Sequence, residues 1–134
     1  MEGKETAQAR INRTIDAFRR NRYDVSFFRE RTAAADYLAA EIEGKRVGFG
    51  DSETLRALSL YEKLSEKNEV IDPPRRAHEG GLEAFLQAGR EALLTDIFIL
   101  SANAITEEGQ IVNMDGAGNR IAGSLFGHEK TYFV

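Results

Sequence analysis

The apolar positions of the chain follow two spacings, one typical of helices and one typical of strands. In residues 4–20, Ile11, Ile15 and Phe18 recur three or four positions apart, which places them on one face of a helix. Helical spacing also predicts helices at 32–42, 82–94 and 116–126, and directly after Ser52. Short runs of β-branched and aromatic residues predict strands at 23–28, 46–49, 69–72, 95–100 and 131–134.

The alternation of strands and helices favours a parallel sheet that is covered by helices on both faces, because each parallel connection has to cross the sheet. We therefore expect an α/β fold of three layers, α/β/α, with a mostly parallel sheet. A small β-hairpin is expected at 105–112, with Glu108 and Gly109 at its turn. The 134 residues fit one domain, 1–134, in which residues 75–81 form a mobile loop.

The composition excludes several kinds of site and partner. The chain has no cysteine, so disulfides, thiolate metal sites and cysteine nucleophiles are excluded. Its net charge of -4 argues against nucleic-acid binding, and the arginines between Arg10 and Arg31 fit a solvated helix face. The two histidines, His78 and His128, lack matching carboxylates, so no metal is expected. No apolar run is long enough to span a bilayer, so we expect a cytoplasmic protein that does not bind membranes.

The first candidate site is the glycine-rich segment between the strand 46–49 and the next helix. Gly48 and Gly50 let a ligand approach the backbone closely, and Ser52 and Thr54 add hydroxyl groups. The first N–H groups of a helix, at the positive end of its dipole, favour an anion. A tight turn with Ser52 as a cap explains the same residues, and the acidic residues on both sides of Ser52 disfavour an anion.

The second candidate site consists of the segments that follow the strand 95–100. Polar groups at the carboxyl end of a buried strand are where open α/β sheets bind ligands. Arg120 is suited to hold a carboxylate or phosphate by two parallel hydrogen bonds. The candidate ligand-binding residues of these segments are Asn103, Asn113, Gly116, Asn119 and Arg120.

Two acidic residues are the candidate catalytic groups. Asp115 is placed to act as a general base, and it equally fits the role of capping the helix that begins near Gly116. Asp96 is the second candidate base. It also fits a role in orienting the Asn103 loop, or that of a polar residue at a strand end.

Several stretches of the sequence resemble the LUD domain family, which includes lactate-utilisation proteins of the LutC type. They begin at Val47, Asp96, Ser101 and Val112, and the most specific runs Asn113-Met114-Asp115-Gly116-Ala117-Gly118-Asn119-Arg120. The resemblance covers most of the chain. It implies a fold like that of the ribose-5-phosphate isomerase, glucosamine-6-phosphate deaminase and CoA-transferase superfamily. It also implies that the loop 48–54 binds phosphate or substrate.

The resemblance further implies a role in oxidation of lactate to pyruvate beside iron–sulfur or flavin oxidoreductase subunits. Without cysteine the chain cannot ligate a cluster, so we expect no cofactor of its own, and any redox centre belongs to a partner. Two departures from the family are Asp51, where a second glycine is common, and the final strand, after which relatives usually continue. This is either a short stand-alone form or a chain whose last strand is completed by another subunit, such as that of a homodimer.

Three functions follow as hypotheses. The first is a component of lactate or organic-acid utilisation that binds a small anionic ligand, either a carboxylate or a phosphorylated compound. The second is a stand-alone sugar-phosphate isomerase or hydrolase, although Asn103 stands where methylthioribose-phosphate isomerases have a catalytic aspartate. The third is a non-enzymatic module that contacts an oxidoreductase.

Overall fold

The computed structural model describes residues 5–134, which group into two compact units. The larger unit comprises residues 30–101 and 114–134. The smaller unit comprises the described residues up to Arg29 together with 102–113. Within the described part of the chain, no helix is long and apolar enough to cross a membrane.

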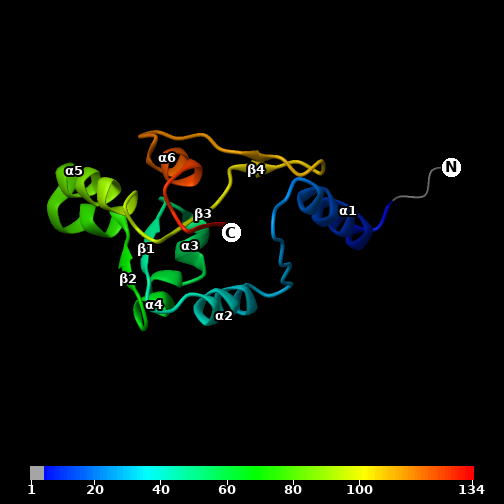
Figure 1. Cartoon of the computed structure of the whole chain (residues 1–134), viewed down its shortest axis with the longest axis horizontal. Coiled ribbons are helices and arrows are strands. Elements are labelled where there is room, and N and C mark those ends of the chain that lie inside the picture. Colours follow the sequence, from blue (N-terminus) through cyan, green and yellow to red (C-terminus); the bar gives the residue numbers. More distant parts are fainter. Residues whose placement is uncertain (1–4) are drawn as a thin grey trace. The chain divides into compact units, whose positions relative to one another are not determined.

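The larger unit is built on a parallel sheet with the strand order β2-β1-β3-β6 (Figure 1). Its strands are β1 (Arg46–Phe49), β2 (Glu69–Ile71), β3 (Ile97–Leu100) and β6 (Lys130–Phe133). The two central strands, β1 and β3, each pair in parallel with a strand on both sides. All four residues of β3 are apolar and buried, as expected for a strand covered on both faces. The mixed α/β fold with a mostly parallel sheet is thus confirmed.

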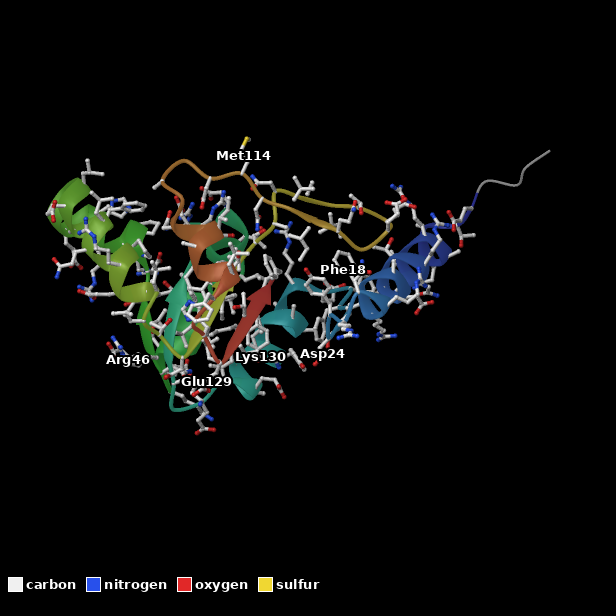
Figure 2. All side chains as sticks on the ribbon, turned by 45° about the horizontal axis from the view of Figure 1, so that its top comes forward. Phe18, Asp24, Arg46, Met114, Glu129 and Lys130 are labelled. Carbon is white, nitrogen blue, oxygen red and sulfur yellow. The ribbon has the colours of Figure 1, made fainter. Side chains whose placement is uncertain are left out.

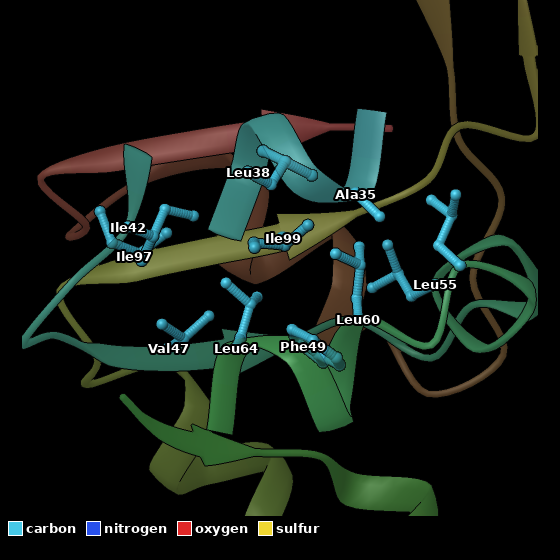
Figure 3. Close-up of a cluster of buried hydrophobic side chains, with 11 residues drawn as sticks. Ala35, Leu38, Ile42, Val47, Phe49, Leu55, Leu60, Leu64, Ile97 and Ile99 are labelled. Atoms are coloured by element: carbon cyan, nitrogen blue, oxygen red, sulfur yellow. The ribbon is translucent and has the colours of Figure 1, made fainter. Parts of the chain in front are cut away.

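Helices pack on both faces of this sheet. The side chains of Val47, Phe49, Ile97 and Ile99 point to one face, where they meet α2 (Arg31–Glu41), α3 (Glu53–Ala57) and α4 (Leu60–Ser65) (Figure 3). Phe98 and Leu100 point to the other face, toward α5 (Pro73–Ala92) and α6 (Asn119–Leu125). Successive residues of a strand point to opposite faces, so β3 contributes to both cores.

Two glycines allow the helices of the second face to approach the sheet closely. A Cβ on Gly48 would lie 2.6 Å from the carbonyl oxygen of Ala92, near the end of α5. A Cβ on Gly123 in α6 would lie 2.4 Å from Cζ of Phe98, whose side chain is buried. Neither position has room for a larger residue.

The smaller unit pairs one helix with the predicted hairpin. It contains α1 (Ala7–Arg20), β4 (Ala104–Ile105) and β5 (Ile111–Val112). At the turn, Gly109 has φ +81°, and a Cβ there would lie 2.7 Å from the carbonyl carbon of Ala17 in α1. The Asn21 amide donates to the carbonyl oxygens of Glu108 and Gly109, at 3.1 and 2.8 Å. The predicted turn is therefore confirmed, and it is bound to the last turn of α1.

The strand predicted at 23–28 is wrong, because these residues have no regular secondary structure. A strand is stable only when its backbone pairs with a neighbouring strand. In this segment, contacts with α1 replace pairing with a neighbouring strand. Tyr23 packs edge-on against Phe18 with ring centroids 5.4 Å apart, and Arg19 donates to the carbonyl oxygen of Val25.

The mobile loop predicted at 75–81 is also wrong, because these residues belong to α5. Pro73 and Pro74 occupy the first turn of this helix, where a missing N–H group leaves no helical hydrogen bond unmade. The helix is kinked at Gly80 and Gly81, whose backbone angles are not helical. The helix predicted after Ser52 is in fact two short helices, α3 and α4, because Ser59 between them is left-handed, with φ +51°.

The close approach of α6 to the sheet gives the first prediction. Gly123→Ala should lower the free energy of unfolding by about 1–3 kcal/mol, because the added methyl group overlaps the Phe98 ring in a packed core. Gly116→Ala is the matched control, since a Cβ there meets nothing within 4 Å, and it should change stability by less than about 0.5 kcal/mol. Equal stability of the two variants in urea denaturation would contradict the packing described.

Candidate functional site

The glycine-rich loop after β1 is held in place at the carboxyl end of the sheet. The N–H group of Gly50 donates to the carbonyl oxygen of Ile99 in β3, at 2.9 Å. A Cβ on Gly50 would lie 2.9 Å from Cγ of Arg120 and from Cβ of Leu100. Gly50 is therefore needed so that the Arg120 side chain can lie across the loop.

The hydroxyl groups of this loop have local partners. Ser52 is buried, and its Oγ accepts a hydrogen bond from the N–H group of Leu55 at 3.3 Å, so it caps α3 as the sequence predicted. The hydroxyl of Thr54 lies 3.3 Å from that of Ser101, the residue that follows β3. This contact joins the first turn of α3 to the residue after β3.

Arg120 connects the loop after β1 to the segment before α6. Its Nε donates to Oδ1 of Asp115 at 2.8 Å, its Nη1 to the carbonyl oxygen of Asp51 at 3.2 Å, and its Nη2 to that of Met114 at 2.5 Å. The side chains of Arg120 and Asp115 are 18% and 6% exposed. This partly buried ion pair fixes the two segments against each other.

Asp115 has the capping role that the sequence allowed. Its Oδ2 accepts a hydrogen bond from the N–H group of Ile121 in the first turn of α6, at 2.8 Å. Burial alone would raise the pKa of this carboxyl, but the hydrogen bonds from Arg120 and Ile121, with the charge of Arg120, hold the pKa below its ordinary value. A carboxylate bound in this way is a weak proton acceptor.

Two of the predicted site residues lie elsewhere in the larger unit. Asp96 stands at the amino end of β3, where its Oδ2 accepts from the N–H group of Arg46 at 2.8 Å and its carbonyl oxygen accepts from Glu129 at 2.7 Å. Figure 2 shows Arg46 and Glu129 at the opposite end of this unit from Met114. Asp96 therefore joins the starts of three strands, and Gly48 lies within β1, packed against α5.

The four remaining candidates are divided between the two units. Asn103 and Asn113 belong to the smaller unit, where the N–H group of Asn103 donates to the carbonyl oxygen of Val112 in the hairpin. Gly116 is exposed in the segment before α6, and Asn119 is the first residue of that helix. The participation of these four residues in one site stays a prediction.

A pocket of about 440 Å³ opens beside the loop after β1, at the carboxyl ends of β1 and β2. This volume lies within the usual range for small-molecule sites. Apolar side chains from Phe49, Leu55, Tyr61 and Pro74 form part of its wall. Its charged and polar lining includes Ser52, Arg56, Glu62, Asp72, Arg75 and His78.

The two arginines of this pocket are held by carboxylates and by an aromatic ring. The Arg75 guanidinium lies 3.8 Å above the centre of the Tyr61 ring and pairs with Glu62. Its Nε lies 3.5 Å from Oδ2 of Asp72. Arg56 pairs with Asp51 at 3.1 Å and with Glu53 at 2.5 Å. Both guanidinium groups are thus positioned before any ligand arrives.

Asp72 is the one acidic group of this pocket that is buried, with 8% of its surface exposed. It occupies the cap position before α5, yet its side chain makes no capping hydrogen bond. Burial raises the pKa of its carboxyl, although the charges of Arg75 and Arg56 lower it in part. The structure therefore keeps a carboxyl at a place where its ionisation is unfavourable.

Asp72, Arg56 and Arg75 were not expected from the sequence. Pro73 and Pro74 favoured the end of a strand followed by a loop. One signal was available: Asp72 directly follows a short apolar strand, and neighbouring parallel strands end at the same edge of a sheet. An acidic residue directly after β2 is therefore expected to lie close to the loop after β1.

The larger unit is thus an open parallel α/β fold with a pocket at the carboxyl edge of its sheet. The family model of the LUD domain matches residues 11–131, so the chain belongs to the LUD domain family. This membership relates the protein to lactate utilisation. Searches of curated proteins and of solved structures gave no significant match.

The buried ion pair gives the second prediction. Asp115→Asn should lower the free energy of unfolding at neutral pH by about 1–3 kcal/mol, because Arg120 loses its charged partner. Since the pKa of Asp115 is lowered in the folded state, this stabilisation exists above the ordinary carboxyl pKa of 3.8 and is lost as the pH falls through the lower, folded value. The gap between wild type and variant in denaturation curves should therefore close in acid.

An exposed ion pair supplies the control for this prediction. Asp36 pairs with Lys63 at 2.6 Å on the surface, and Asp36→Asn should change stability by less than about 1 kcal/mol at neutral pH. If Asp115→Asn lowers the free energy of unfolding as little as Asp36→Asn does, the ion pair with Arg120 does not hold the loop.

Proposed function

We propose that this chain binds a small carboxylate ligand of lactate or organic-acid metabolism in the pocket beside the loop after β1. The observation on which this rests is the placement of two positioned guanidinium groups, Arg56 and Arg75, in a pocket of suitable volume. Planar guanidinium groups bind carboxylates by paired hydrogen bonds. Membership of the LUD domain family supports lactate or its oxidation product as the ligand.

The charge balance of the pocket favours a carboxylate over a phosphorylated ligand. Arg56 and Arg75 supply two positive charges. Within the described residues, four acidic side chains lie against them, namely Asp51, Glu53, Glu62 and Asp72. A phosphate group carries nearly two negative charges at neutral pH, so it would meet more repulsion there than a monocarboxylate would. This charge balance supports a small carboxylate as the proposed ligand.

The residues of the Arg120 ion pair support this pocket from outside it. Arg120 lies across Gly50, and Gly50 itself lines the pocket. In this proposal Asp115 and Asp96 stabilise the fold and do not act as bases, because each already accepts hydrogen bonds from the backbone. The ligand is oxidised or reduced, if at all, by an iron–sulfur or flavin partner, since the chain has no cysteine to hold a cluster.

The third prediction tests ligand binding directly. Millimolar lactate or pyruvate should raise the melting temperature of the wild type, because a ligand that binds only the folded state stabilises it. Arg75→Gln should weaken this binding about tenfold or more, as measured by calorimetric titration. Arg31→Gln, an exposed arginine of α2, is the control and should bind as the wild type does.

Two results would contradict the proposal. One is the absence of any shift with carboxylates in the wild type, together with capture of an oxidoreductase subunit, which would favour the interaction module. The other is turnover of an aldose phosphate by the isolated chain, which would favour the isomerase or hydrolase hypothesis.

A further inference from the structure

We propose that Asp72 recognises a hydroxyl group next to the carboxylate of the ligand, so that the pocket selects 2-hydroxy acids over the matching 2-keto acids. This inference rests on the proposed function, because it assigns a specificity-determining residue to the same pocket. It goes further by stating which of two closely similar ligands the pocket prefers.

The Asp72 carboxylate does not cap the helix that it precedes. An aspartate before a helix normally accepts hydrogen bonds from the N–H groups of the first turn. The next two residues are Pro73 and Pro74, which have no N–H group, and the Asp72 side chain makes no capping hydrogen bond. Within residues 5–134, its ion-pair contact is Arg75, at 3.5 Å.

The Asp72 carboxyl is held mostly out of solvent at the wall of the pocket. Removing a carboxylate from most of its water without strong hydrogen bonds in exchange raises its free energy. Asp72 is 8% exposed and lines the pocket, so a ligand is the natural source of a donor. Carboxyls whose ionisation is made unfavourable by burial, and which face a cleft, are typical of functional sites.

The position of Arg75 beside Asp72 indicates which kind of donor the ligand supplies. Arg75 borders both the pocket and Asp72, so a carboxylate that binds Arg75 brings its second carbon near Asp72. A hydroxyl on that carbon donates to the carboxylate of Asp72. A keto oxygen has no hydrogen to donate and is repelled by the carboxylate, so the hydroxy acid binds more tightly.

The preference should depend on pH. When Asp72 is protonated, it becomes a donor and accepts either ligand, so the preference for the hydroxy acid shrinks as the pH falls. The charged groups around Asp72 are Arg56, Arg75, Asp51 and Glu62, and His78 also lines the pocket. The variant His78→Gln separates any effect of this imidazole from that of Asp72.

The fourth prediction compares lactate, pyruvate and propionate, which differ only at the second carbon. Calorimetric titration of the wild type at neutral pH should give lactate binding about tenfold or more tighter than pyruvate binding, with propionate between them. In Asp72→Asn, whose amide both donates and accepts, lactate and pyruvate should bind with affinities that differ by less than about threefold. Asp16→Asn, an exposed aspartate of α1, should keep the wild-type ratio.

The outcomes separate this inference from the proposed function. If the wild type binds both acids and Asp72→Asn keeps the same ratio, the role of Asp72 is refuted and the carboxylate pocket stands. If the wild type binds none of the three acids, the pocket itself is refuted, and the role of Asp72 with it. If Asp72→Asn fails to fold, the wild-type ratio decides, measured as the pH is lowered from neutral to the ordinary carboxyl pKa of 3.8. A falling ratio supports the inference, and a constant ratio overturns it.

Discussion

The strands of a parallel sheet all end at one edge, and this constraint determines where the candidate site lies. The short apolar strands β1, β2 and β3 pair in register, so the residues that follow them lie close together. Gly50 follows β1, Asp72 follows β2 and Ser101 follows β3. The hydrophobic sequences of the strands thus fix the positions of polar groups that are far apart along the chain.

Asp115 and Asp72, two aspartates of the larger unit, differ in the hydrogen bonds that their carboxylates accept. Asp115 accepts hydrogen bonds from Arg120 and from the first turn of α6, and its ionised form is stabilised. Asp72 occupies the cap position of α5 directly before two prolines, which have no N–H group, and its side chain makes no capping hydrogen bond. The first aspartate is thus bound within the fold, whereas the second lines the pocket without a capping hydrogen bond.

The sequence was sufficient to predict the elements whose apolar spacing is regular. Helices α1, α2 and α6, the sheet strands and the hairpin turn at Gly109 were all expected. The segment 23–28 was mistaken for a strand, because composition does not reveal whether a partner strand is available. The start of α5 was missed, because two prolines are equally typical of a loop and of a first helical turn.

The candidate site could be predicted only where its residues form a local sequence pattern. The glycines and Ser52 form a recognisable local pattern, and the interpretation of Asp115 as a cap needed only its position before α6. The approach of Arg120 to Gly50 joins residues 70 positions apart, and a single sequence contains no signal for it. Asp72 and Arg75 line the pocket because α5 begins at Pro73, and the sequence did not predict this start of the helix.

The central claim is that Asp72 is a buried carboxyl whose hydrogen-bond donor comes from the ligand. An NMR titration that follows the Asp72 carboxyl carbon tests this most directly. In the ligand-free protein its pKa should lie above the ordinary value of 3.8, and saturating lactate should lower it, because the ligand hydroxyl stabilises the ionised form. A pKa at or below the ordinary value without ligand, or one that lactate leaves unchanged, would contradict the account.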